Sequence, residues 1–189
     1  MDIDTGISVD TYFEIDAASE TPVEYWGGEA VVLPGETFPH LKLKKRVVRL
    51  LDDALPLCET YPSGLRVEAP DLGRANYAYP DVVTLCEESQ FDESTRPHTL
   101  LNPSLLGEVL SSSTSAYDLD QKLTAYLQIP SLMAYVIVDP QTPRVRIYHR
   151  TGDGVRMEEV QGLDAVASVP SLNLALSLRA LYEDILPAS

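Results

Sequence analysis

The chain has 189 residues, the size of one ordinary domain, and is 44% hydrophobic and 23% charged, which excludes disordered, collagen-like and coiled-coil proteins. Its longest apolar run, residues 131–138, is far shorter than the roughly 20 residues that cross a bilayer. The formal charge of −15 argues against a protein whose whole surface binds nucleic acid, because lysine and arginine supply most of the phosphate binding.

The first ten residues contain three aspartates and no basic residue, which is the wrong charge for a secretory signal. We therefore expect one cytoplasmic domain over residues 1–189 with no membrane segment. Cys58 and Cys86 are too few for a disulfide scaffold and lack the spacing of a zinc site. Both are expected to be buried thiols.

Helices and short strands alternate along the chain. A helix is predicted over residues 8–17 with Ser8 as its N-cap, and a hairpin over residues 23–33 with its turn at Gly27-Gly28. Residues 39–55 form an amphipathic helix, because their apolar side chains recur at helical spacing. The remaining elements are strands at 57–61, 65–69, 82–85, 104–110, 132–138, 145–149 and 155–160, a loop with one helical turn at 87–103, and helices at 115–128 and 171–185. This order predicts an α/β (α+β) fold, a mixed β-sheet flanked by helices with an N-terminal hairpin.

The basic residues gather in two stretches that hold nine of the 14 lysines and arginines. The members are Lys42, Lys44, Lys45, Arg46 and Arg49 on the predicted amphipathic helix, and Arg144, Arg146, Arg150 and Arg156 around a later hairpin. One interpretation is a solvated helix face and an exposed hairpin. The other is a rim that binds anions, in which Lys42, Lys45, Arg46 and Arg49 contact nucleic acid. If so, both clusters should face the same opening as the acidic site described next.

Two acidic residues are candidates for chemistry. Glu108 lies within an apolar strand, where a carboxylate is costly unless it is paired, protonated or bound to a metal. Asp81 follows Pro80 at the start of another apolar strand. Together they could bind Mg²⁺ or Mn²⁺, with Lys122 beside them to offset phosphate charge. The alternative is ordinary: Asp81 is a turn residue, and Lys122 forms a surface pair with Asp118.

Five segments, in this order, resemble one known family. They are VEYWGGEAVVLP, YAYPDVV, GEVLSSST, YDLDQKLTAYLQIPSLMAYVIVDP and VRIYHR, and they resemble the Uma-two family of restriction-endonuclease-like proteins within the PD-(D/E)xK nuclease superfamily. The resemblance covers nearly the whole chain. It implies a restriction-endonuclease-like core and metal-dependent cleavage of nucleic-acid phosphodiesters.

The resemblance also implies roles for individual residues. Asp81 matches the acid of the family's Pro-Asp, and Glu108 matches the acid of its Glu-Val-Leu strand. The superfamily lysine usually lies two residues after that glutamate, where this chain has Leu110, and Lys122 matches the migrated lysine of the family. Glu24 matches an acid of the N-terminal hairpin. His40, at the start of the basic helix, is either a phosphate contact or a packing residue.

Two functional hypotheses follow. The first is an endonuclease that uses Mg²⁺ or Mn²⁺ and acts on nucleic acid, DNA in particular, with Asp81 and Glu108 as metal ligands and with Lys122 and Glu24 as further catalytic residues. The second is a non-catalytic interaction protein that retains the nuclease fold. A homodimer is expected in either case, and Trp26 beside the hairpin turn is a core or dimer contact.

Overall fold

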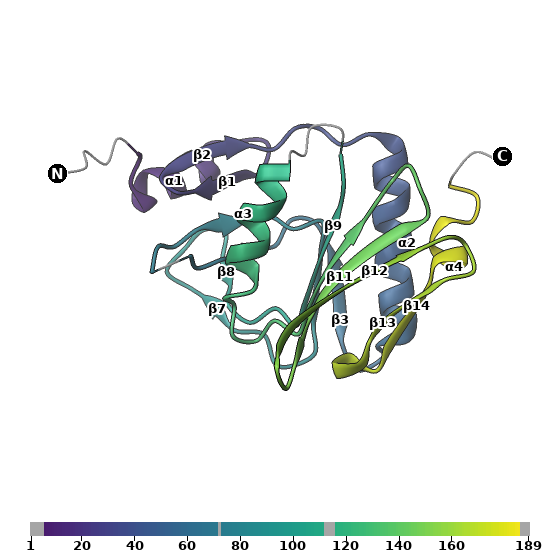
Figure 1. Ribbon diagram of the computed structural model, residues 1–189. Helices are drawn as coiled ribbons and strands as arrows, with labels where there is room; N and C mark the ends of the chain where they lie inside the picture. The colour runs from purple at the N-terminus through teal and green to yellow at the C-terminus, as the bar shows by residue number, and fades with distance from the viewer. Residues whose placement is uncertain (1–5, 72, 112–115, 186–189) are drawn as a thin grey trace.

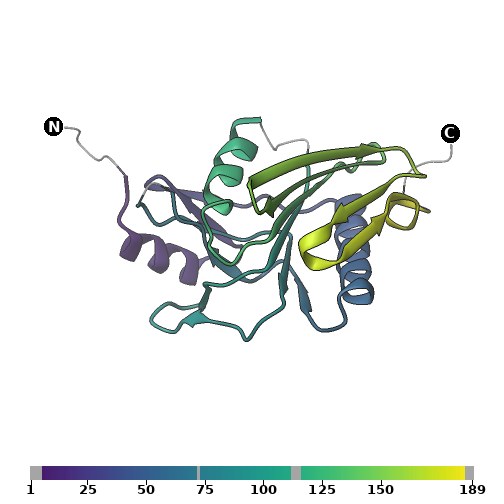
Figure 2. The ribbon, with the colours of Figure 1, turned by 60° about the horizontal axis from the view of Figure 1, so that its bottom comes forward.

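The computed structural model describes residues 6–71, 73–111 and 116–185. These residues form two six-stranded sheets, one two-stranded sheet and four α-helices (Figure 1). Helix α1 (Val9–Ala18) lies at one end of the molecule, and the C-terminal hairpin with helix α4 (Leu178–Tyr182) lies at the other (Figure 2). The Ser8 side chain caps α1 as predicted, because its Oγ accepts a hydrogen bond from the Thr11 amide at 3.1 Å.

The first sheet contains the N-terminal hairpin. Its strand order is β2 (Glu29–Val32), β1 (Val23–Trp26), β5 (Tyr77–Ala78), β4 (Arg66–Glu68), β8 (Thr99–Leu100) and β7 (Phe91–Asp92). The predicted turn between β1 and β2 is confirmed, since Gly27 and Gly28 both have positive φ angles, 60° and 97°. Residues 87–103 contain the short strands β7 and β8, so the helical turn expected there is wrong.

The second sheet is the centre of the molecule. Its strand order is β12 (Gly154–Gln161), β11 (Arg144–Thr151), β10 (Ala134–Val138), β9 (Leu105–Val109), β6 (Val82–Leu85) and β3 (Glu59–Pro62). Strands β9 and β10 are parallel, and every other neighbouring pair in this sheet is antiparallel. The prediction of a mixed sheet with flanking helices is confirmed.

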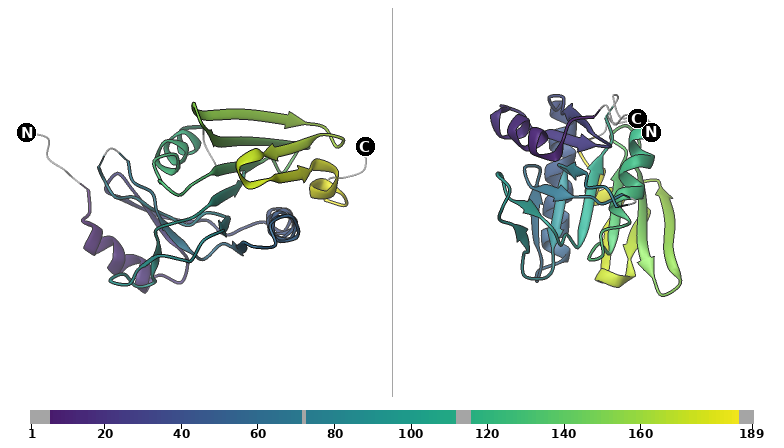
Figure 3. Two further views of the ribbon diagram at one scale, coloured as in Figure 1. Left: turned by 90° about the horizontal axis from the view of Figure 1, so that it is seen from below. Right: turned by 90° about the vertical axis from the view of Figure 1, so that its left-hand side faces the viewer.

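Different elements cover the two faces of the second sheet. One apolar cluster packs α2 (Phe38–Ala54), α4 and the hairpin of β13 (Val166–Val169) and β14 (Leu174–Ser177) against one face. A second cluster packs α3 (Ala116–Tyr126) and the first sheet against the other face. Figure 3 shows α2 and α3 on opposite sides of these strands. Alternation of buried side chains along β9 and β10 supplies apolar residues to both clusters.

The C-terminal prediction needs correction. Residues 171–185 are not one helix: a 3₁₀ turn at Pro170–Leu172 leads into β14, and only the five residues of α4 are α-helical. Leu174 and Leu176 are buried while Ala175 between them is exposed, which is the period of a strand. Strand β14 pairs with β13, and that long-range pairing overrides the helical propensity of the leucines.

The two cysteines also differ from the prediction. Cys58 and Cys86 form a disulfide, with their Cα atoms 4.2 Å apart. The antiparallel pairing of β3 with β6 places Glu59 opposite Leu85, so the cysteines are the next residues outward on the two strands. In the described part of the chain, every helix is too short or too polar to span a bilayer.

Candidate active site

Two acidic residues meet at one end of strands β6 and β9. These strands are antiparallel with Val82 opposite Gly107, so Asp81 just before and Glu108 just after that pair lie at the same end. The Val109 amide donates a hydrogen bond to Asp81 Oδ2 at 2.8 Å, which ties Asp81 to β9. A Cβ atom on Gly107 would lie 3.1 Å from Val82 Cβ, so the glycine allows the two strands to approach. Strand pairing therefore brings the predicted acidic pair together.

Lys122 connects Glu108 to a second glutamate. Its Nζ donates to Glu108 Oε1 and to Glu24 Oε1, both at 3.1 Å, and its side chain is only 18% exposed. One helical turn further along α3, the Tyr126 hydroxyl donates to the same Glu108 oxygen at 3.2 Å. The spacing of four residues places Lys122 and Tyr126 on one face of the helix. The lysine thus points into the protein and is not part of a solvated surface pair.

Glu24 reaches this site from strand β1 of the first sheet. It is 2% exposed, and three donors hold its carboxylate. The Tyr79 amide donates to Oε1 at 3.0 Å, the Trp26 indole donates to Oε2 at 2.9 Å, and Lys122 supplies the third hydrogen bond. The N-terminal hairpin therefore contributes an acidic side chain to the same cluster as Glu108.

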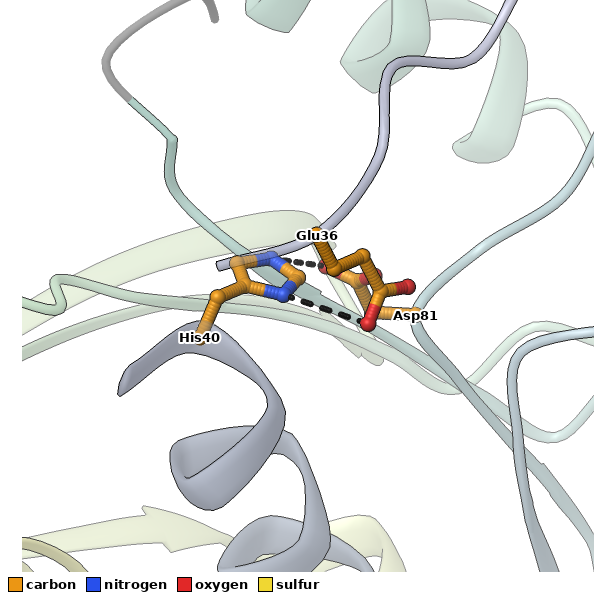
Figure 4. Close-up of side chains that lie close together, drawn as sticks. All are labelled: Glu36, His40 and Asp81. Atoms are coloured by element: carbon orange, nitrogen blue, oxygen red, sulfur yellow. Dashed lines mark ion pairs between the residues drawn. The ribbon is translucent and has the colours of Figure 1, made fainter. Parts of the chain in front are cut away.

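A second group of side chains surrounds Asp81 (Figure 4). His40 Nε2 lies 3.2 Å from Asp81 Oδ2, and its Nδ1 lies 3.7 Å from Glu36 Oε2. Lys44 Nζ lies 3.7 Å from Asp81 Oδ1, pairs with Glu36 and donates to Ser63 Oγ at 2.8 Å. These residues come from the loop before α2 and from its first turns, so the start of α2 forms one wall of the site.

Sequence reasoning missed Glu36 as a site residue and placed Lys44 only in the basic cluster. The usable signal was spacing, since His40 and Lys44 are four residues apart on one face of α2, and Glu36 lies four residues before His40 in the loop that precedes the helix. This spacing does not indicate a site by itself, because Asp81, the acid that these side chains surround, is far away in sequence.

The charges in the cluster shift one another's titration. Burial, together with the nearby Asp81 and Glu24 carboxylates, raises the pKa of Glu108 to about 7, although Lys122 opposes this shift. Burial favours the neutral form of Lys122, but the two glutamates outweigh it and raise its pKa. Burial also acts on Asp81, where the hydrogen bond and charge of His40 prevail and hold the pKa below its ordinary value. At neutral pH, Asp81 and Lys122 are therefore charged while Glu108 titrates.

The donor set fits a hard divalent cation. Asp81 and Glu108 offer carboxylate oxygens at neighbouring strand ends, which suits Mg²⁺ or Mn²⁺. The pKa of Glu108 is raised first by burial and then by the Asp81 and Glu24 carboxylates, and a cation would relieve the repulsion among these negative charges. Ligand atoms of Glu36, His40 and Asp81 also lie within 4.8 Å of one another. Each set of donors has an ammonium group beside it, since Lys44 pairs with Glu36 and lies near Asp81, and Lys122 pairs with Glu108.

The basic stripe of α2, formed by Lys42, Arg46 and Arg49, does not face the acidic pair, although Lys44 of the same basic cluster lies beside Asp81. Helix α2 packs on the sheet face opposite α3, and Arg46 donates to the Ala180 carbonyl at 2.7 Å. Lys42 likewise donates to the Asp184 carbonyl at 3.2 Å, and Arg49 forms an exposed ion pair with Asp53. The expectation that this stripe lines the same opening as Glu108 is wrong for Lys42 and Arg46, which bind the C-terminal segment.

The arginines around the later hairpin, the second basic cluster, do not all lie on the same side of the molecule as the acidic pair. Arg146 lies opposite Ile137 on β10, and Ile137 lies opposite Glu108, so Arg146 shares the sheet face of Glu108 two strands away. It forms an ion pair with Glu159 at 3.0 Å. Arg150 instead donates to carbonyls of the segment that follows α3, including that of Leu132 at 2.8 Å. Only part of the second cluster is thus placed near the acidic site.

Comparisons with known proteins identify the family of this chain. Residues 9–180 match the family Uma2, described as "Putative restriction endonuclease". Two Synechocystis proteins, both uncharacterized, are similar: sll1609 is 31% identical over 148 residues, which are 75% of this chain and 80% of that protein, and slr1290 is 29% identical over 150 residues, which are 78% and 76%.

A solved structure supports the fold. The crystal structure of a "putative nuclease belonging to DUF820" from Anabaena variabilis superimposes with a TM-score of 0.71 at 19% identity, covering 89% of this chain and 93% of that one. This likeness confirms the predicted restriction-endonuclease-like fold. Together with the match over residues 9–180, it leads to one conclusion: the chain belongs to the Uma2 family of restriction-endonuclease-like proteins.

Proposed function

We propose that this Uma2 protein is an endonuclease that uses Mg²⁺ or Mn²⁺ to hydrolyse phosphodiester bonds of DNA. Asp81 and Glu108 would hold the ion, and Lys122 and Glu24 would complete the catalytic group. The observation that carries the proposal is the buried Lys122 ammonium, which bonds Glu108 and Glu24 directly beside the strand end that presents Asp81.

When bound, the divalent ion supplies Lewis-acid polarisation of the scissile phosphate. The chain's own residues then have separate tasks. Lys122 offsets negative charge that develops on the phosphate, and its two glutamate partners fix the direction of its Nζ. Glu108, whose pKa is raised to about 7 without the ion, would give up its proton to bind the cation through its carboxylate. Asp81 stays ionised beside His40 and is ready to bind a cation.

Arg146 is the best candidate for a phosphate contact away from the reacting bond. It shares the sheet face of Glu108, and its side chain is 37% exposed. To bind a phosphate it would exchange its partner Glu159, which lies at the surface. We therefore propose that DNA crosses the face of β11, and that Arg146→Ala weakens DNA binding and reduces its dependence on salt.

The test is a cleavage assay on supercoiled plasmid, linear duplex, single-stranded DNA and RNA, with Mg²⁺, Mn²⁺, Ca²⁺ or EDTA. Wild-type protein should cleave DNA only with Mg²⁺ or Mn²⁺. Asp81→Asn, Glu108→Gln and Lys122→Met should each lose at least about a hundredfold in rate, a typical cost for one catalytic contact. Glu87→Gln, at an exposed glutamate outside the site, is the matched control and should keep full activity. Equal activity in all variants would refute the assignment.

The second candidate function is a non-catalytic interaction protein with a nuclease fold. The distribution of charge favours this function. The protein has a formal net charge of −15, and several arginines that could bind phosphate form ion pairs within the chain, including Arg144 with Asp139 and Arg179 with Asp164. Absence of cleavage under every metal condition, with divalent ion binding still lost in Asp81→Asn, would favour this function.

We further propose a homodimer and a cytoplasmic location. The long edge strand β12, with Val155 and Met157 44% and 53% exposed, supports a protein contact there. Light scattering after size exclusion tests the dimer, and Met157→Lys should weaken it. Disulfides are rare in reducing compartments such as the cytoplasm. Trapping of free thiols at Cys58 and Cys86 in cell extracts therefore tests the location, because it measures whether the two cysteines are reduced in the cell.

A further inference from the structure

A buried carboxylate on helix α1 lies behind the candidate site. The Asp16 side chain is 2% exposed and accepts three hydrogen bonds. Its Oδ1 accepts a hydrogen bond from the Val23 amide at 3.0 Å. Its Oδ2 accepts hydrogen bonds from Arg66 Nη1 at 2.7 Å and from the Tyr79 hydroxyl at 2.5 Å. Both oxygens therefore accept hydrogen bonds from donors inside the protein, and the carboxylate does not face solvent.

Two of these donors belong to the segments that hold Glu24. Val23 directly precedes Glu24 on β1, and the Tyr79 amide donates to Glu24 Oε1 at 3.0 Å. Asp16 therefore binds the backbone amide of Val23, which precedes Glu24 in the chain. It also binds the side chain of Tyr79, whose backbone amide holds the Glu24 carboxylate. A shift of Asp16 would move both supports of the Glu24 carboxylate together.

The partner of Asp16 makes the arrangement rigid. Arg66 is completely buried, donates through Nε to Thr99 Oγ1 at 2.9 Å and lies over the Phe13 ring at 4.6 Å. A buried ion pair is a weak source of stability, because desolvation of both charges offsets their attraction. Its fixed geometry is a stronger reason for such a pair beneath a site whose atoms must be held in place.

We propose that Asp16 is a positioning residue for the site: through Val23 and Tyr79 it holds the Glu24 carboxylate where Lys122 can bridge it to Glu108. This inference deepens the proposed nuclease function and rests on it for its effect on catalysis. It adds α1 and Tyr79, the residue just after β5, to the parts of the chain that determine the direction of the lysine, although neither contributes a ligand.

The chain contains a reporter that is independent of activity. Trp26 is the only tryptophan, it is 8% exposed, and its indole Nε1 donates to Glu24 Oε2 at 2.9 Å. Movement of the Glu24 carboxylate changes that hydrogen bond, and the fluorescence of Trp26 responds. Excitation at the red edge of the tryptophan band avoids the ten tyrosines.

The main test variant is Tyr79→Phe, which removes the hydroxyl bond to Asp16 but keeps the backbone amide that binds Glu24. Tyr182→Phe is the matched control, because Tyr182 is also buried, belongs to the apolar cluster on the other face of the sheet and donates to the carbonyls of Asp139 and Arg144. Glu24→Gln gives the reference spectrum for a disturbed indole contact. Asp16→Asn is measured as well, with circular dichroism to check that it folds.

The expected result is that Tyr79→Phe and Asp16→Asn shift the Trp26 emission toward the Glu24→Gln spectrum, while Tyr182→Phe matches wild type. The cleavage rate at saturating DNA should fall about fivefold in Tyr79→Phe, the kinetic equivalent of one hydrogen bond, with KM unchanged. A wild-type spectrum in Tyr79→Phe, or an equal shift in Tyr182→Phe, would overturn the proposal. If wild type cleaves nothing, the proposed function fails, and the fluorescence still decides whether Asp16 positions Glu24.

Discussion

Glu108 offers the sharpest test of the electrostatics, through the substitution Glu108→Gln in metal-free protein. Its pKa is raised from 4.5 to about 7 by burial and by neighbouring carboxylates. An acid with a raised folded-state pKa binds its proton more tightly when folded. The folded state is therefore favoured at low pH, and this stability is lost as pH rises from about 4.5 to about 7.

The size of the effect follows from the shift. One pKa unit corresponds to about 1.4 kcal/mol, so a shift of about 2.5 units gives about 3 kcal/mol between pH 5 and pH 8. The glutamine side chain mimics the protonated acid and still accepts from Lys122. Glu108→Gln should accordingly match wild type at pH 5 and exceed it by about 3 kcal/mol at pH 8, or about 6 to 12 °C in melting temperature.

The assay is urea unfolding of both proteins in EDTA at pH 5, 6, 7 and 8. The His40 pKa is raised, so its contribution to stability is present below about 6.5 and is lost as pH rises through its folded-state value. This contribution is common to both proteins, and only their difference reports on Glu108. Parallel pH profiles, or a Glu108→Gln protein that is less stable at pH 8, would refute the reasoning. The latter would mean that the buried Lys122 needs the negative charge of Glu108.

Three further outcomes follow. With an assumed dissociation constant of about 1 mM, roughly 10 mM Mg²⁺ should stabilise the wild-type protein by about 1.4 kcal/mol. Thermal melts of Asp81→Asn should show no such gain in stability. Equal gains in both proteins would mean that the ion binds elsewhere. Reduction of the Cys58–Cys86 disulfide, which closes a loop with a sequence separation of 28, should cost about 3.5 kcal/mol in urea unfolding, whereas the Cys58→Ser protein should not respond to reductant. Gly107→Ala, whose Cβ would lie 3.1 Å from Val82 Cβ, should cost about 1 to 3 kcal/mol and lower Mg²⁺ affinity in calorimetry; unchanged affinity would show that strand spacing does not control the acid pair.

Much of the framework is local and could be predicted from the sequence. The Ser8 cap determines the start of α1, apolar period determines α2, the Gly27-Gly28 pair determines the first hairpin, and apolar runs determine β6 and β9 with their acids at the ends. These features depend on residues within a few positions of one another, where backbone preference and side-chain period act directly. The family resemblance supported Lys122 and added Glu24, and no local pattern reveals that these two residues are connected.

Tertiary structure decided how distant segments meet. The register of β3 against β6 paired the cysteines, the docking of α2 turned Lys44 and His40 toward Asp81 while Lys42 bound the C-terminal segment, and β13 converted an expected helix into β14. Each outcome depends on contacts between residues far apart in the chain. A one-dimensional pattern states which side chains are buried, but the partner that each buried charge finds is determined only when the sheets and helices pack.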